Sequence, residues 1–171
     1  MKLCGEIVGF VAILFNFLIY QQKDRKNLLK IKVLSGFSWA LHYGLLFAFS
    51  GMAVCLIGFF RDLTFLLTVN KNSKNRIWLL LIFASISIAT SIFTYNNLFD
   101  LLPTLASLIA VFSYWQQKPT VTKILGLPIS ISMLTYDIIK LSYMGIANEI
   151  FSLISITWYF ISSKKRKKSA V

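Results

Sequence analysis

Two oppositely charged residues, Arg61 and Asp137, stand inside long apolar stretches of this sequence and are the residues best suited to bind a polar group. Arg61 lies nine residues into its stretch, which at the helical rise of 1.5 Å per residue is about 13 Å deep. An ionised side chain near the centre of a bilayer costs about 2.5 to 3.5 kcal/mol, so it persists where a counter-charge, water or a bound solute compensates it. We therefore expect Arg61 and Asp137 to line a polar central cavity. The alternative is an ion pair that only fixes how the helices pack.

Asp62, the immediate neighbour of Arg61, is the other candidate counter-ion. Successive residues of a helix point about 100° apart, which makes them poor direct partners. We expect Asp137 to be the better partner of Arg61.

His42 lies in the second apolar stretch, beside Trp39 and Tyr43. Because imidazole can change its charge between about pH 5 and 8, His42 would suit a proton-coupled or gating role. A hydrogen-bonded packing residue in an aromatic environment is the alternative.

Further polar residues mark the ends of apolar stretches. Gln21 and Gln117 close the first and the fifth, where they would line an inner gate or meet lipid headgroups. Pro103 opens the fifth stretch and would act as a hinge or simply begin a helix, whose first turn has no N–H bond to lose. Glu149 lies about one turn inside the last stretch, where a carboxylate is easily solvated.

The chain shows no arrangement typical of an enzyme. It has a single histidine, no nucleophile elbow, no phosphate-binding glycine loop and no cysteine or histidine spacing that suits a metal. We expect no catalytic residues, no metal and no cofactor. Cys4 and Cys55 would form either one disulfide bond or two inert packing residues.

The composition indicates a membrane protein built from helices. Of 171 residues, 57% are hydrophobic and only 14% are charged, too few to coat a soluble globule of this size. The apolar stretches are continuous rather than alternating, which favours helices over transmembrane strands. About 20 residues cross the hydrocarbon core, and seven segments of this kind follow one another: residues 5–22, 31–50, 52–70, 77–95, 100–117, 123–143 and 146–163.

Lysine and arginine are concentrated at alternate ends of these segments. The clusters are Lys23 to Lys32, Lys71 to Arg76, Lys118 with Lys123, and Lys164 to Lys168. Because cytoplasmic loops collect cations, this pattern predicts an N-terminus outside and a C-terminus inside the cell. The net charge of +12 therefore favours contact with anionic headgroups and not with nucleic acid.

The sequence also repeats itself weakly. The run Phe17, Gln21, Gln22 and Lys23 returns 95 positions later, and after a one-residue slip Ser38, Gly51 and Ala53 return 94 positions later. This repeat predicts a single all-α domain with two parallel three-helix bundles, residues 5–70 and 100–163, a linker helix at 77–95 and a basic tail at 164–171. Small residues at four-residue spacing, Gly36, Ala40 and Gly44, predict a close helix contact.

Two families share features with this chain. The run from Trp39 to Gly44 and the arrangement of three, one and three helices resemble the SWEET and PQ-loop transporters, although the Pro-Gln dipeptide of the PQ-loop group is absent. The YgjV-type bacterial inner membrane proteins are more similar: they share the loop Lys23-Asp24-Arg25-Lys26 placed nineteen residues before His42, the arginine at Arg61 nineteen residues after it, the run Asp100-Leu101-Leu102-Pro103, and Glu149. Where that family shows His-Asn, this chain has Tyr136-Asp137.

The resemblance implies a bacterial inner membrane location, and we expect a SWEET-like carrier for a small polar or anionic solute. Arg61, Asp137, His42, Trp39 and Tyr136 would contact this solute while the two bundles rock around it. The alternative is a membrane scaffold whose buried charges serve packing only. The sequence indicates neither the identity of the solute nor the oligomeric state.

Overall fold

The computed structural model describes residues 2–45, 49–68, 77–95, 97–139 and 142–168. Within these residues the expected all-α fold is confirmed, with seven α-helices and one short 3-10 turn. They are α1 (Lys2–Gln21), α2 (Arg25–Leu45), α3 (Phe49–Leu67), α4 (Ile77–Thr94), η2 (Leu98–Asp100), α5 (Leu101–Trp115), α6 (Pro119–Ile139) and α7 (Tyr143–Lys168). The basic cluster from Lys71 to Arg76 lies outside the described residues.

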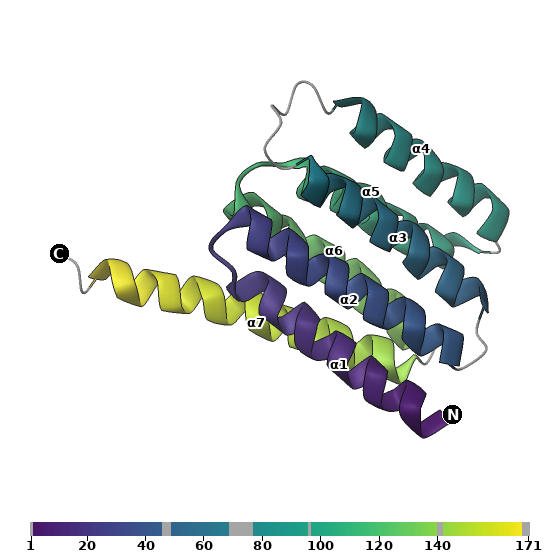
Figure 1. Ribbon diagram of the computed structural model, residues 1–171, viewed down its shortest axis with the longest axis horizontal. Coiled ribbons are helices and arrows are strands. Elements are labelled where there is room, and N and C mark those ends of the chain that lie inside the picture. The colour runs from purple at the N-terminus through teal and green to yellow at the C-terminus, as the bar shows by residue number, and fades with distance from the viewer. Residues whose placement is uncertain (1, 46–48, 69–76, 96, 140–141, 169–171) are drawn as a thin grey trace.

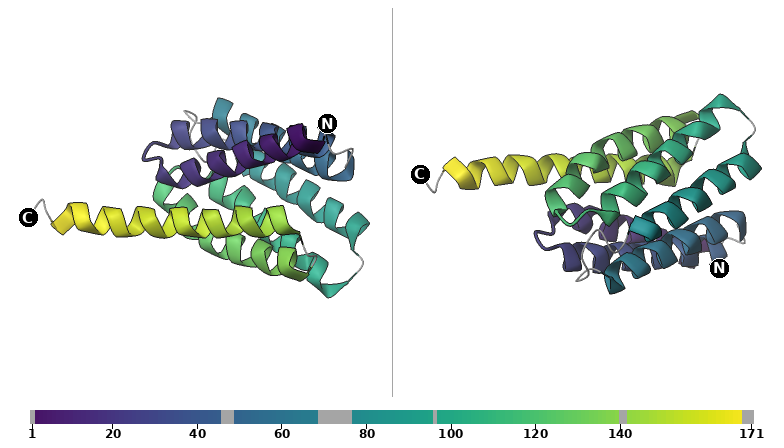
Figure 2. Two further views of the ribbon diagram at one scale, coloured as in Figure 1. Left: turned by 90° about the horizontal axis from the view of Figure 1, so that it is seen from below. Right: turned by 90° about the horizontal axis from the view of Figure 1, so that it is seen from above.

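The helices form two groups of three that face each other, with α4 beside them (Figures 1 and 2). Along the chain α2 packs against α1 and α3, and α6 packs against α5 and α7. Between the groups α1 packs closely along α7, whereas α3 touches α5 only over a short length. The six helices therefore enclose a common interior, and α4 packs on the outside of α5.

Membrane-type helices account for much of the chain. Four described segments are long and apolar enough to cross a membrane: Cys4–Gln21, Leu98–Trp115, Pro119–Ile139 and Tyr143–Ser163. The apolar segment Ile77–Phe93 is shorter. Large apolar side chains point outward, with Leu67 75% and Phe93 89% exposed. Such an outer surface suits lipid, and helices satisfy their own backbone there.

Several helices extend beyond the apolar segments from which we predicted them. Helix α2 begins at Arg25 instead of 31, α6 begins at Pro119 instead of 123, and α7 continues through the basic tail to Lys168. Charged residues mark where a helix leaves the hydrocarbon, but they do not end it, because long cationic side chains reach water from the headgroup region. Proline at the first position of α6 suits a helix start.

The cationic segments that the structure describes lie at one end of the bundle. Helices α1, α3, α5 and α7 end there and α2, α4 and α6 begin there, and α7 projects beyond the others (Figure 1). We name this the basic end and the other the opposite end. The predicted placement of the basic end in the cytoplasm stays a prediction.

The interior near the basic end is a hydrophobic layer shared by both groups. Its side chains are at most 1% exposed and come from five helices: Ile19, Leu28, Phe65, Val111 and Ile156. The two groups therefore share one core at this end, and this core removes apolar surface of both groups from water.

The predicted close contact at the small residues of α2 is confirmed, and its partner is α3. A Cβ added at Gly36 would lie 3.5 Å from the backbone of Phe59, and one at Gly44 would lie 3.1 Å from the sulfur of Met52. Ala40, between them, is buried. Helices can approach this closely only where side chains are small.

Candidate functional site

Arg61 forms an ion pair with its neighbour Asp62. The guanidinium Nε lies 2.8 Å from Oδ1 of Asp62, which is almost completely buried, while the Arg61 side chain keeps 13% exposure. The expectation that Asp137 would be the partner is wrong. Because successive Cα–Cβ bonds of a helix diverge, neighbouring residues with short side chains cannot contact each other. The arginine side chain is long enough for its Nε to turn back to the carboxylate of the next residue.

Two cations meet the ring of Tyr114 on α5. The Cζ of Arg61, on α3, and the Nζ of Lys32, on α2, each lie 5.5 Å from the ring centroid. Tyr114 is 4% exposed, so these cation–π contacts are formed away from bulk water, where they are stronger than at a surface. We name Lys32, Arg61, Asp62 and Tyr114 the central polar cluster; it joins α2 and α3 to α5, across the two groups.

Glu149 ends a chain of hydrogen bonds that crosses from α1 to α7. We name this contact the seam of α1 with α7, and the contact across the central polar cluster the seam of α3 with α5. The hydroxyl of Ser35 donates to Asn16 at 2.9 Å, the amide of Asn16 donates to Asn148 at 2.6 Å, and the amide of Asn148 donates to the Glu149 carboxylate at 2.8 Å. Ser130 on α6 also interacts with this carboxylate. Each donor points toward Glu149, which is the arrangement that a buried negative charge favours.

Asp137 lies at the beginning of α7 rather than at Arg61. A Cβ added at Gly145 would lie 2.5 Å from its carboxylate, so the carboxylate rests on the first turn of α7. The amide ends of a helix carry partial positive charge, which stabilises an anion there. Asp137 interacts electrostatically with Glu149 and with Tyr43. Tyr136, the preceding residue, is half-buried.

His42 is buried at the contact of α1 with α2. Its Nδ1 lies 2.7 Å from the carbonyl oxygen of Gly5, and a Cβ added at Gly9 would lie 2.7 Å from the same nitrogen. The ring also meets Trp39 edge-on at 5.4 Å between centroids. The structure thus places His42 and Trp39 in the packing of the first group, which supports the packing alternative.

At the basic end, polar side chains form hydrogen bonds between the two groups of helices. Gln21 donates to the carbonyl and the hydroxyl oxygen of Ser155, both at 2.9 Å. Lys123, completely buried, donates to the Gln22 carbonyl oxygen and lies 3.1 Å above the Tyr159 ring. Arg25 donates to the carbonyl of Tyr114.

Two further predicted site residues lie at the ends of α5. Gln117 is exposed just after the end of α5. Pro103 lies in the first turn of α5, a position that suits helix initiation. Cys4 and Cys55 are free, so they do not form a disulfide bond with each other.

Four residues that matter here were missed from the sequence. Lys32 was counted with the loop cations, yet it lies two turns inside α2 and points to Tyr114. Lys123 was counted with Lys118 as a loop cation, and Tyr114 was not singled out. Pro128 lies inside α6, where proline removes a backbone hydrogen bond. Two features of the sequence could have revealed them. Lys32 lies within one helical turn of an apolar segment, and Pro128 lies inside one.

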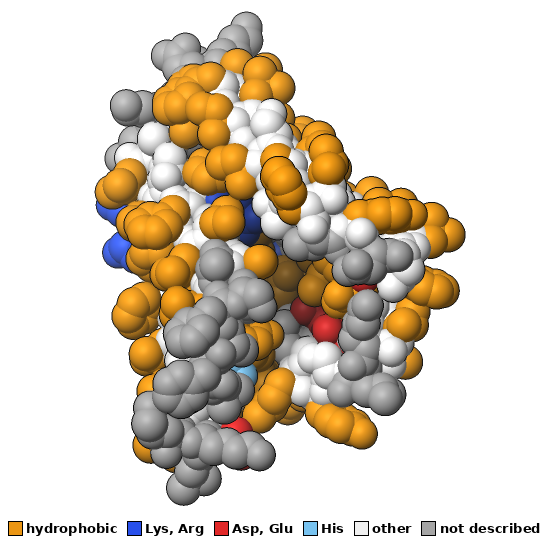
Figure 3. All heavy atoms as spheres, turned by 90° about the vertical axis from the view of Figure 1, so that its right-hand side faces the viewer, with side chains coloured by type: hydrophobic (Ala, Val, Ile, Leu, Met, Phe, Trp, Pro, Cys, Tyr) orange, Lys and Arg blue, Asp and Glu red, His pale blue; other side chains and the backbone are white. Residues whose placement is uncertain are grey.

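The polar interior opens away from the basic end. Viewed onto the opposite end, the molecule is hollowed at its centre, and acidic and basic side chains are visible there among hydrophobic ones (Figure 3). Among the described residues no group of three or more histidine, cysteine, aspartate or glutamate side chains could hold a metal ion. The arrangement places charged and hydrogen-bonding groups in the interior between the two groups of helices.

Comparison with known proteins identifies the family. A family model described as a bacterial inner membrane protein, Imp-YgjV, matches residues 3–167. No curated protein and no solved structure matches the chain. The resemblance to SWEET transporters stays a prediction, whereas the family match spans nearly the whole sequence. The chain belongs to the YgjV-type family of bacterial inner membrane proteins.

Proposed function

We propose that this protein is a carrier that moves a small polar solute across the bacterial inner membrane by rocking of the α1–α3 group against the α5–α7 group. The observation that carries the proposal is the central polar cluster. Both groups contribute to it, and it includes a permanently charged guanidinium in the interior between them. Charged groups at such a position usually mark a solute pathway.

The depth of the polar residues supports a pathway from the opposite end. Counting along α3 from Phe49, Arg61 is twelve residues in, or about 18 Å at 1.5 Å per residue. Glu149 is six residues into α7, or about 9 Å. The polar interior therefore extends to about the middle of a 30 Å hydrocarbon core, and the hydrophobic layer of Ile19, Leu28 and Phe65 lies beyond it.

The two seams between the groups differ in a way that suits rocking. The seam of α1 with α7 carries the bonds of Gln21 to Ser155 and of Asn16 to Asn148. The seam of α3 with α5 is short, and Arg61 over Tyr114 is a contact across it. A rigid-body motion that keeps the first seam and opens the second would expose the central polar cluster to the basic end.

Lys32 is the best residue for a test because Lys30 provides a matched control. Lys32 reaches the ring of Tyr114, whereas Lys30, two positions away on the same helix, is exposed. We expect purified protein in proteoliposomes to take up at least one solute from a panel of sugars, amino acids and organic acids. Lys32→Gln should abolish that uptake while the protein remains folded, and Lys30→Gln should transport normally. Equal uptake by the two variants, or no uptake of any solute, would count against the carrier.

A scaffold function is the second candidate, and one observation favours it. Arg61 finds its counter-ion in the same helix, so the charge of its guanidinium is compensated without a solute. A buried pair of this kind can specify packing alone. Under this function, substitutions in the cluster would lower stability and no solute would be transported.

A further inference from the structure

Two hollows on the surface of α7 adjoin each other and share Trp158. The first, of about 110 Å³, lies between the end of α1 and the last turns of α7. Its lining is polar and aromatic: Gln21, Lys23, Trp158, Tyr159, Ser162 and Ser163. One cation and two hydroxyl groups are the donors that bind phosphate groups in proteins.

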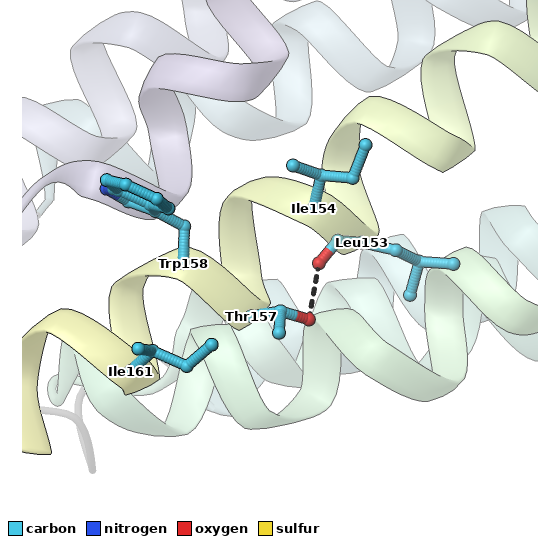
Figure 4. A pocket seen from close by; sticks show the side chains of 5 residues that line it. All are labelled: Leu153, Ile154, Thr157, Trp158 and Ile161. Carbon is cyan, nitrogen blue, oxygen red and sulfur yellow. Dashed lines mark hydrogen bonds between the residues drawn. The ribbon is translucent and has the colours of Figure 1, made fainter.

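The second hollow is an apolar groove of about 320 Å³ along α7, lined by Leu153, Ile154, Thr157, Trp158 and Ile161 (Figure 4). The Thr157 hydroxyl donates to the Leu153 carbonyl oxygen at 2.8 Å, so the polar atom of this side chain is already satisfied. Ile154 and Ile161 are each about half exposed. The groove therefore offers hydrocarbon surface rather than hydrogen bonds.

The two hollows lie at the depths of the two parts of a lipid molecule. The groove runs from Leu153 to Ile161, eight residues along α7, or about 12 Å at 1.5 Å per residue. One leaflet of a 30 Å hydrocarbon core is about 15 Å thick, so the groove covers most of that depth. The polar hollow is at the basic end, and the groove runs from it toward the middle of the bilayer.

The positive charges around the polar hollow favour the binding of an anion. Lys23 lines it, and Lys123 lies directly behind the ring of Tyr159, close enough for the two cations to repel each other. The acid next to Lys23 is Asp24, whose carboxylate accepts the amide of Asn27 at 3.1 Å at the beginning of α2. A phosphate group in the hollow would relieve the repulsion between the two lysines.

We propose that the seam of α1 with α7 binds an anionic phospholipid, with the headgroup phosphate against Lys23, Ser162 and Ser163 and one acyl chain along the groove from Trp158 to Leu153. The site is separate from the central polar cluster, so it does not depend on transport. A bound lipid would link the end of α1 to α7 and would strengthen the seam that Gln21 and Ser155 already hold.

The test compares an anionic phospholipid with two ligands that each lack one of its features, either the net negative charge or the acyl chains. Full-length protein in a neutral detergent is mixed with phosphatidylglycerol, with phosphatidylcholine of the same acyl chains, or with inorganic phosphate. Thermal unfolding and native mass spectrometry then report binding. We expect phosphatidylglycerol to raise the unfolding temperature by several degrees and to remain bound in the spectrometer, while the other two do neither.

Matched variants then place the lipid. Lys23→Gln should weaken phosphatidylglycerol binding about tenfold, the effect of losing one charge-assisted contact, and Lys30→Gln should leave it unchanged. Ile161→Thr, in the groove, should weaken binding, and Ile150→Thr, which is exposed on α7 outside the groove, should not. Equal binding of inorganic phosphate would indicate a simple anion site, and equal effects of the two lysine variants would indicate diffuse surface charge. Either result would overturn the proposal.

Discussion

The pairing of Arg61 with Asp62 leads to a quantitative prediction for a double-mutant cycle. At the Nε–Oδ1 distance of 2.8 Å and an effective dielectric constant of 20, the Coulomb attraction is about 6 kcal/mol before desolvation. Removing one partner of a buried pair costs about 3 to 5 kcal/mol, since the other charge is left uncompensated. Arg61→Met leaves the almost completely buried carboxylate of Asp62 in that position.

We therefore expect Arg61→Met to lower the free energy of unfolding by about 4 kcal/mol and Asp62→Asn by about 2 kcal/mol, because the partly exposed guanidinium keeps its contact with Tyr114. The double variant should cost about 3 kcal/mol, which gives a coupling energy of about 3 kcal/mol. Titration of the detergent-solubilised protein with SDS, followed by tryptophan fluorescence, measures each value.

Asp137→Asn provides the control for this cycle. The Asp137 carboxylate rests on the first turn of α7 and not on Arg61, so the effects of Arg61→Met and Asp137→Asn should add to within about 0.5 kcal/mol. The reasoning is refuted if Arg61 couples more strongly to Asp137 than to Asp62.

Two further predictions concern packing and the basic end. Gly9→Ala places a Cβ 2.7 Å from the His42 ring and should destabilise by about 1 to 3 kcal/mol, whereas Gly58→Ala, which meets nothing within 4 Å, should be neutral or slightly stabilising in the same SDS titration. Lys123→Met removes a buried hydrogen bond and a cation–π contact and should lower the free energy of unfolding by about 2 kcal/mol. Lys118→Met, at an exposed position, should have no measurable effect. Equal losses from the two lysine variants would contradict the structural role of Lys123.

The helices and their grouping were predictable because lipid imposes a strong constraint on sequence. A segment of about 20 apolar residues must be helical where no water can satisfy the backbone. The spacing of Gly36, Ala40 and Gly44 predicted a close helix contact, and the structure confirms it with α3 as the partner. Such features depend on local composition and on helical periodicity, which a single sequence records directly.

The partners of the charged side chains were not predictable in the same way. Whether Arg61 reaches Asp62 or Asp137 depends on how a long side chain turns within an interior that five or six helices build together. Lys32 shows the same limit: its position among loop cations suggested the headgroups, yet two helical turns bring its ammonium to Tyr114. Charge patterns predict which end of a helix meets water, but they do not indicate which cation turns inward.

The internal repeat explains why the two seams are chemically different. Under its shift of 94 residues, Ser155 on α7 corresponds to Arg61 on α3. At the seam of α1 with α7 this position holds a small hydroxyl that accepts the amide of Gln21. At the equivalent seam of α3 with α5 it holds a guanidinium over Tyr114. A neutral hydrogen bond needs no counter-charge, whereas a charged side chain in the interior requires a polar environment. The repeated position therefore carries a neutral hydrogen bond at the longer seam and a charged side chain at the shorter one, an asymmetry that the proposed rocking of one group against the other would use.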